Sequence, residues 1–284
     1  MNLILCPTDF SKSADNALHY AASLADGISA RLIIMHVYEK PVMYSDAPLT
    51  RIAHAAEQMK ENTEKKLKQV IAKLQKKHKN ATFEMLLKDG LASEKLIEVA
   101  KKQNVDLIVM GATGTSKLAR LLIGSTTSTI IRDAPCPVLS IPKQASFDGI
   151  KKIVFATDLN EDNISSATMI SSFAKMFDAE ISFVFVDDKH LLHSDEQIAA
   201  MTNKIRKRVK YAKISGYVSK NTSITKGIEY FLKKKPADIL VMFTHARHFP
   251  ESMFNTSVTK MMSHQSSIPL LALKHNDRPL LSPH

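Results

Sequence analysis

Short apolar runs alternate with amphipathic stretches along the first half of the chain. The apolar runs predict buried strands at Leu3–Cys6, Arg31–Val37, Ala81–Leu87, Val105–Met110 and Val138–Ile141. Between them apolar residues recur at helical spacing, most extensively from about Thr50 to His78, where lysines lie opposite the apolar stripe. The second run is too continuously apolar to have one face in water. The β-α-β-α order therefore predicts an α/β fold, a doubly wound parallel sheet with helices on both faces.

The second half of the chain repeats the first. Asp158 and Glu180–Val186 stand 149 positions after their counterparts, whereas Ala237–Met242 stands 132 positions after Val105–Met110. The 17 residues that separate these offsets are lost mostly from the loop and long helix after the second strand. We expect two tandem domains of one α/β type, residues 1–143 and residues 150–274, with Lys143 to Gly149 as the linker.

Composition narrows the functional classes. The net charge is +11, but the lysines fall on outer helix faces, and the low aromatic content, without tryptophan, argues against nucleic-acid binding. We find no apolar stretch of 18 residues and no basic leader, so we expect a cytoplasmic protein without a membrane partner. Cys6 and Cys136 lie in or beside core strands, which indicates reduced thiols rather than a disulfide framework.

The main candidate chemistry lies in a glycine-containing stretch after the fourth strand. Gly111, Gly114 and Gly124 precede a predicted helix start at Ser125. Glycine allows close approach of the backbone to a ligand, and a helix N-terminus offers free N–H groups to an anion. If the first and fourth strands are neighbours, Asp9 faces this stretch across the crevice where open parallel sheets bind ligands. A nucleotide site is the favoured interpretation, and a glycine-rich connection without a ligand is the alternative.

Other motifs carry less weight. The spacing of the glycines after the fourth strand does not fit the Walker A loop, and the turn after the first strand lacks the glycines of the dinucleotide fingerprint. In the second half Phe243 takes the place of Gly111, and Pro250 removes an N–H donor. His36 is interpreted as a hydrogen-bonded strand residue rather than a catalyst. We expect no metal site from the two weak H-x-x-H pairs and one further histidine, which are His190, His193, His245, His248 and His264.

The motif Gly-x2-Gly-x9-Gly-Ser from Gly111 to Ser125, with Thr8–Ser11 after the first strand, resembles the universal stress protein family, specifically its tandem two-domain members. The resemblance covers both halves, but only the first has the motif. It implies a five-stranded parallel sheet of order 3-2-1-4-5 in each domain. It also implies that Val138–Ile141 and Leu270–Leu273 pair as an intrachain pseudo-dimer, and it is compatible with a homodimer.

The same resemblance implies a ligand. Motif-bearing members bind ATP or a related adenine nucleotide (ADP or AMP), often with Mg²⁺ or Mn²⁺. The residues expected at the adenine and ribose are Pro7, Thr8, Asp9 and Val37. Those expected beneath the ribose and phosphates are Met110, Gly111 and Gly114. Those expected to hold the phosphates at the helix start are Gly124, Ser125 and Thr126. Because the second half lacks the motif, we expect one nucleotide per chain.

The leading hypothesis is an adenine-nucleotide-binding stress-response protein that acts as a sensor or regulator with an unidentified protein partner. No catalytic residue is predicted, because nothing near the expected phosphates provides a dedicated base. One alternative is a slow ATP-hydrolysing or phosphotransfer enzyme. Another is a protein-interaction module that works without a nucleotide.

Overall fold

The computed structural model describes residues 1–38, 49–112, 125–157, 163–187, 195–243 and 268–274. The predicted loop from Pro41 to Pro48, Gly114, Gly124, Asp158 and the two H-x-x-H pairs lie outside these residues. In the first half the described elements are β1 (Leu3–Pro7), α1 (Lys12–Gly27), β2 (Arg31–Tyr38), α2 (Leu49–Lys77), β3 (Thr82–Asp89), α3 (Ala92–Lys102), β4 (Leu107–Gly111), α4 (Ser125–Asp133) and β5 (Val138–Ile141).

The second half follows the same order of elements. They are β6 (Lys152–Thr157), α5 (Asn163–Phe177), β7 (Glu180–Asp187), α6 (Asp195–Val209), β8 (Ile214–Lys220), α7 (Ile224–Lys234), β9 (Ile239–Phe243) and β10 (Leu270–Leu273). Helix α2 has 29 residues and its counterpart α6 has 15, so most of the 17-residue difference between the halves lies in this helix. The predicted place of the loss is confirmed.

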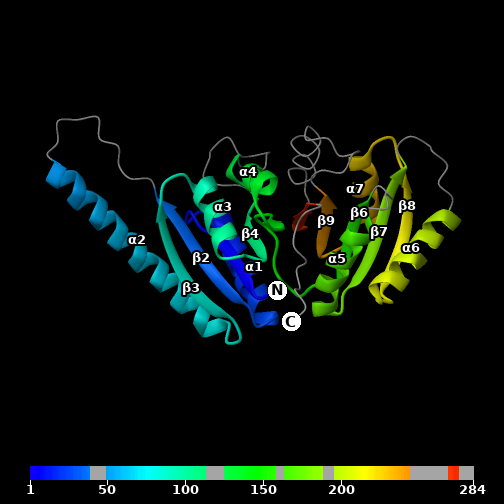
Figure 1. The fold of residues 1–284 in the computed structure, drawn as a ribbon, viewed down its shortest axis with the longest axis horizontal. Coiled ribbons are helices and arrows are strands. Elements are labelled where there is room, and N and C mark those ends of the chain that lie inside the picture. The colour runs from blue at the N-terminus through cyan, green and yellow to red at the C-terminus, as the bar shows by residue number, and fades with distance from the viewer. Residues whose placement is uncertain (39–48, 113–124, 158–162, 188–194, 244–267, 275–284) are drawn as a thin grey trace.

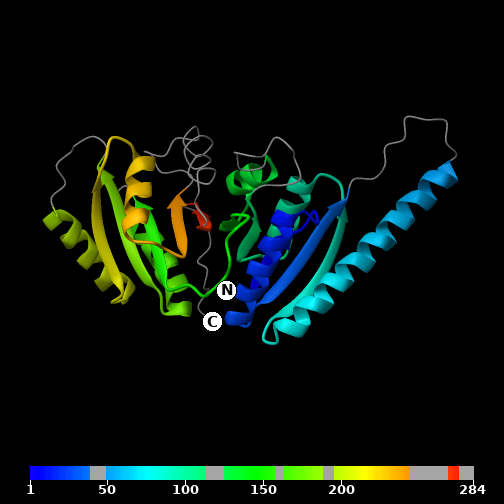
Figure 2. The ribbon, with the colours of Figure 1, turned by 180° about the vertical axis from the view of Figure 1, so that it is seen from behind.

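The ten strands that the structure describes form one continuous sheet in the order β3-β2-β1-β4-β5-β10-β9-β6-β7-β8. Each half thus has the order 3-2-1-4-5, with parallel pairing inside it. The halves meet where β5 and β10 pair antiparallel, with Ser140 opposite Leu270. Figure 1 shows the halves side by side, with α2 and α6 on the outer flanks, and Figure 2 shows the same arrangement from behind. The predicted α/β architecture and the pairing of the fifth strands are confirmed.

The helices cover the sheet on both faces. Helices α1, α2, α5 and α6 share one apolar core that runs across the junction, where Leu139 and Ile141 of β5 and Leu271 and Leu273 of β10 all belong to it. On the other face α3 and α4 pack on the first half, and α7 packs on the second. This two-sided burial explains why strands such as β5 and β9 are apolar at nearly every position.

An aspartate fastens the start of the first strand in each half. Asp106 Oδ2 accepts the backbone N–H groups of Asn2 at 2.7 Å and Leu3 at 3.0 Å. Asp238 Oδ2 accepts those of Lys151 at 2.7 Å and Lys152 at 2.8 Å. The carboxylate stands just before the fourth strand of its half, so it ties the central pair of strands together at their amino ends.

Replacing either aspartate with alanine is expected to lower the free energy of unfolding by about 1–2 kcal/mol, because two N–H groups lose a charged acceptor at the surface. Urea unfolding of Asp106→Ala and Asp238→Ala measures the loss. Asp148→Ala is the matched control, since this exposed carboxylate accepts only from the nearby Ser146 hydroxyl at 2.8 Å among the described contacts. Losses equal to that of the control would contradict the role assigned to these carboxylates.

Candidate functional site

The strand order reverses direction at β1 and β4. Strand β1 lies between β2 and β4, with Ile4 opposite both Leu32 and Leu107. The chain leaves β1 for α1 on one face of the sheet and leaves β4 toward α4 on the other. Such a switch point opens a crevice at the carboxyl ends of the two strands. The condition for Asp9 and the glycine stretch to meet, that β1 and β4 are neighbours, is therefore fulfilled.

A tightly bonded turn follows β1. The buried Thr8 donates its N–H to Met35 O on β2 at 2.9 Å, and its hydroxyl accepts the N–H of Phe10 at 3.1 Å. Asp9 accepts the N–H of Ser11 through Oδ1 at 2.9 Å and is exposed. Because its other carboxylate oxygen has no partner among the described residues, the turn keeps one exposed acceptor beside the carboxyl end of β1.

Helix α1 starts directly from this turn. Ser11 is its N-cap and accepts the N–H of Ala14 at 3.1 Å. Ser13, two residues further along the chain, is buried against β4. The cap fixes the direction of α1 relative to Asp9.

Phe10 has an unusual backbone conformation for a residue with a side chain. Its φ is 60°, in the left-handed region. The ring centroids of Phe10 and His36 lie 4.7 Å apart, and the Lys66 ammonium of α2 lies 4.0 Å from the Phe10 ring. Nδ1 of His36 is 2.7 Å from Thr8 O, so the interpretation of His36 as a hydrogen-bonded strand residue is confirmed. The contacts of Phe10 and Lys66 escaped sequence reasoning, because no local pattern pairs residues so far apart.

Gly111 ends β4 against the first turn of α1. A Cβ at this position would lie 2.6 Å from Ser13 Oγ and 3.0 Å from the Ser13 carbonyl carbon and oxygen. The space is therefore filled by the first turn of α1. The sequence motif explains a glycine at position 111 by the close approach of a ligand. The structure adds a second reason for the missing side chain, which is the close approach of helix α1.

The carbonyl of Gly111 also holds the start of α4. It accepts the hydroxyl of the buried Thr127 at 3.0 Å, and the next residue, Ala112, donates its N–H to Ile141 O at 2.9 Å. Ser125 and Thr126, in the same first turn, are exposed. The leading N–H groups of a helix have no acceptors within the helix, and its dipole favours an anion there.

The predicted site residues that the structure describes gather at this edge. Val37 and Met110, at the carboxyl ends of β2 and β4, belong to one apolar cluster. Pro7, Thr8 and Asp9 lie between them, since β1 separates β2 from β4. The first turn of α4 adjoins Gly111 through the Thr127 bond. The edge combines an apolar wall, an exposed carboxylate and an exposed helix start.

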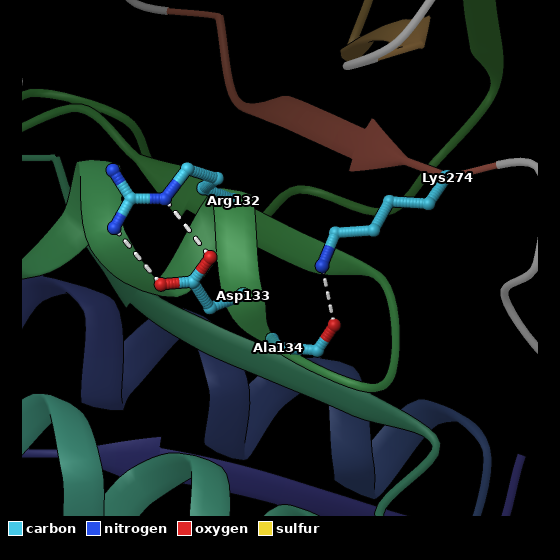
Figure 3. Close-up of polar contacts among 4 residues, drawn as sticks. All are labelled: Arg132, Asp133, Ala134 and Lys274. Carbon is cyan, nitrogen blue, oxygen red and sulfur yellow. Dashed lines mark hydrogen bonds and ion pairs between the residues drawn. The ribbon is translucent and has the colours of Figure 1, made fainter.

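The far end of α4 contacts the second half. Lys274, just beyond β10, donates from its ammonium to the carbonyl of Ala134, which follows α4 (Figure 3). Beside it Arg132 donates two hydrogen bonds of 2.9 Å to the Asp133 carboxylate, and these bonds hold the pKa of Asp133 below its ordinary value. Helix α4 thus begins at the candidate site and ends at the junction between the halves.

The corresponding edge of the second half is built differently. Phe243 ends β9 opposite Leu273, just as Gly111 ends β4 opposite Ile141. Its side chain is buried, and its ring centroid lies 5.5 Å from that of Phe155 in the core shared with α5. The second half thus has an aromatic side chain at the position where the first half has Gly111, which has no side chain.

The described residues offer little for covalent or metal chemistry. Burial raises the pKa of the Cys6 thiol far above its ordinary value, so Cys6 is no nucleophile at neutral pH. In the part of the chain that the structure describes, no three His, Cys, Asp or Glu side chains gather to hold a metal ion. None of the described helices is both long and apolar enough to cross a membrane. The described part of this edge offers hydrogen-bonding groups, which are the Asp9 carboxylate and the start of α4.

Comparisons with known proteins agree on one family. The model of the universal stress protein family matches residues 1–142 and again residues 149–274. A universal stress protein of Methanocaldococcus jannaschii is 31% identical over 140 residues, which are 49% of this chain and 81% of the relative. One from Thermus aquaticus is 31% identical over 138 residues, 49% of this chain and 96% of the relative. Each relative corresponds to about half of this chain.

A solved structure matches the whole arrangement. The crystal structure of a universal stress protein from Archaeoglobus fulgidus covers 96% of this chain and 96% of its own, with a TM-score of 0.69 and 17% identity. At that identity the likeness shows the fold, including the presence of both halves. The chain therefore belongs to the universal stress protein family, as a member in which two units of the family follow one another.

Proposed function

We propose that this stress-response protein binds an adenine nucleotide, ATP, ADP or AMP, at the carboxyl ends of β1 and β4, and that it acts as a sensor or regulator. The observation that carries the proposal is the pairing of two anchored features at the switch point. The turn after β1 presents the exposed Asp9 carboxylate. The carbonyl of Gly111 anchors the exposed first turn of α4 beside it. A sugar hydroxyl and a phosphate chain need donors and acceptors placed in this way.

Each part of the site then has a role. Val37 and Met110 provide the apolar wall for the adenine end, next to Pro7 and Thr8. The Asp9 carboxylate accepts hydrogen bonds from ribose hydroxyls. The N–H groups at the start of α4, with the hydroxyls of Ser125 and Thr126, hold the phosphates. Mg²⁺ or Mn²⁺ enters with the nucleotide, because such ions are bound largely by phosphate oxygens and water.

The panel of ligands to compare includes ATP, ADP, AMP and cAMP. One universal stress protein structure, 23% identical over half of this chain, was solved in complex with cAMP. Its TM-score of 0.37 is too low to bear on this site. Cyclic AMP is included in the panel only as a comparison ligand, and the proposal does not depend on it.

Calorimetric titration with ATP and Mg²⁺ is expected to give one site per chain, because Phe243 replaces the glycine in the second half. Asp9→Ala is expected to weaken binding about tenfold or more through the loss of charged hydrogen bonds. Asp15→Ala is the matched control, since Asp15 is exposed on α1 and lies 3.9 Å from His19. A stoichiometry of two nucleotides per chain would contradict the single-site assignment. If no nucleotide bound at all, the alternative of a protein-interaction module that works without a nucleotide would be favoured.

The same proteins also test for catalysis. The proposal expects ATP turnover no faster than a slow background, because it assigns the exposed Asp9 carboxylate to the ribose rather than to a water molecule or a phosphate. Fast steady-state hydrolysis that disappears in Asp9→Ala would make the protein an enzyme instead.

A further inference from the structure

His36 donates a hydrogen bond to the peptide that carries Asp9. Nδ1 of His36 lies 2.7 Å from the carbonyl oxygen of Thr8. A carbonyl oxygen only accepts, so Nδ1 carries the hydrogen whether the ring is neutral or charged. The carbonyl belongs to the peptide group that joins Thr8 to Asp9. The bond therefore fixes the plane from which the Asp9 side chain starts.

The rest of the turn depends on the same ring. Phe10, with its φ of 60°, is in a left-handed conformation that is strained for a residue with a side chain. The His36 ring packs against it at 4.7 Å between centroids, and the Lys66 ammonium lies 4.0 Å from its ring. His36 thus contacts the turn twice, by a hydrogen bond before Asp9 and by a ring contact after it.

The second half keeps the frame but not the donor. Thr157 stands at the position of Thr8, and its partner across the ladder is Phe185, which stands at the position of His36. A phenylalanine ring has no N–H group to hold a carbonyl. The glycines of the motif and the histidine donor therefore occur together in the first half and are absent together from the second.

We infer that His36 is a positioning residue of the nucleotide site, which acts through the Thr8–Asp9 peptide to hold the Asp9 carboxylate toward the ligand. The inference rests on the proposed function. His36 does not touch the nucleotide in this role, so its contribution reaches the ligand only through Asp9.

Two substitutions separate the two contacts of His36. His36→Phe introduces the residue of the second half, keeps a ring against Phe10 and removes the donor. His36→Asn keeps an N–H donor on a short side chain and removes the ring. ATP affinity measured by calorimetry is expected to fall about 3–10-fold in His36→Phe, because the variant lacks one hydrogen bond that holds the Thr8–Asp9 peptide. In His36→Asn it is expected to stay within about twofold of wild type.

A double-mutant cycle then tests the route through Asp9. In an Asp9→Ala background, adding His36→Phe is expected to weaken ATP binding by less than about twofold. The matched control is His19→Phe, because the His19 side chain on α1 is 55% exposed and lies outside the site. Urea midpoints of all variants separate affinity from stability.

The outcomes are distinct. Equal ATP affinities of His36→Phe and wild type would overturn the inference while the proposed function stands. So would additive losses in the cycle, which would mean that His36 acts independently of Asp9. Equal losses in His36→Phe and His36→Asn that follow their urea midpoints would reduce His36 to a packing residue. If wild type binds no nucleotide, the proposed function fails and the positioning role fails with it.

Discussion

Replacing Gly111 with valine is expected to abolish ATP binding and to lower the free energy of unfolding by about 1–3 kcal/mol. Even the first carbon of the new side chain would lie 2.6 Å from Ser13 Oγ and 3.0 Å from the Ser13 backbone, so the start of α1 must move away from β4. That movement displaces the turn that holds Asp9. It also strains the carbonyl that anchors Thr127 of α4. Calorimetry measures the binding and urea unfolding the stability.

Gly27→Val is the matched control for this variant. Gly27 is the last residue of α1, and a Cβ there would meet no atom within 4 Å. We expect this control to bind ATP like wild type and to lose little stability. If Gly111→Val bound ATP with unchanged affinity, the site would have to lie away from the carboxyl end of β4.

Replacing Phe243 with alanine is expected to lower the free energy of unfolding of the second half by about 3–5 kcal/mol. The Phe243 side chain is 4% exposed, and its ring meets Phe155 edge-on, with 5.5 Å between centroids and 63° between planes. Phe155 in turn meets Phe183 at 5.1 Å. Removing one ring leaves a cavity in an aromatic cluster that the surrounding strands cannot fill. Thermal or urea unfolding measures the loss.

Tyr230→Ala serves as the comparison, because Tyr230 lies on α7 and is 50% exposed. Its loss is expected to be below about 1 kcal/mol. A similar small loss for Phe243→Ala would show that the ring contributes little to the core. The last position of the fourth strand thus resists change in both halves. At Gly111 there is no space for a side chain, and at Phe243 the side chain fills the space.

The fold could be predicted from the sequence because its apolar runs are buried on both faces. The errors lie at element ends. The apolar run places Val105 in the fourth strand, yet its N–H donates to Ala100 O at the end of α3, and β4 begins at Leu107. The apolar side chain of Val105 is buried in either setting, so hydrophobicity could not distinguish them. Asp106, between Val105 and Leu107, accepts hydrogen bonds from the backbone N–H groups of Asn2 and Leu3. No local sequence pattern reveals these partners, because they lie more than 100 residues away.

The candidate site was predictable only in part. The spacing of Gly111 and Asp9 after two strands indicated a shared crevice, because parallel strands end at one edge of the sheet. The neighbours that hold these residues in place, Ser13, Lys66 and Thr127, come from three different helices. Their contacts depend on how those helices pack, which sequence spacing does not specify. The same holds for Lys274, which reaches Ala134 across the junction.

The antiparallel contact of β5 with β10 has a consequence for how the protein can evolve. A strand at the edge of a sheet is a template for unwanted association, and here each unit shields the edge of the other. In a dimer of identical chains, every substitution alters both copies at once. One gene that encodes both units removes this constraint, so a change at Phe243 leaves Gly111 untouched. The second unit can therefore acquire new surfaces while it continues to shield the first.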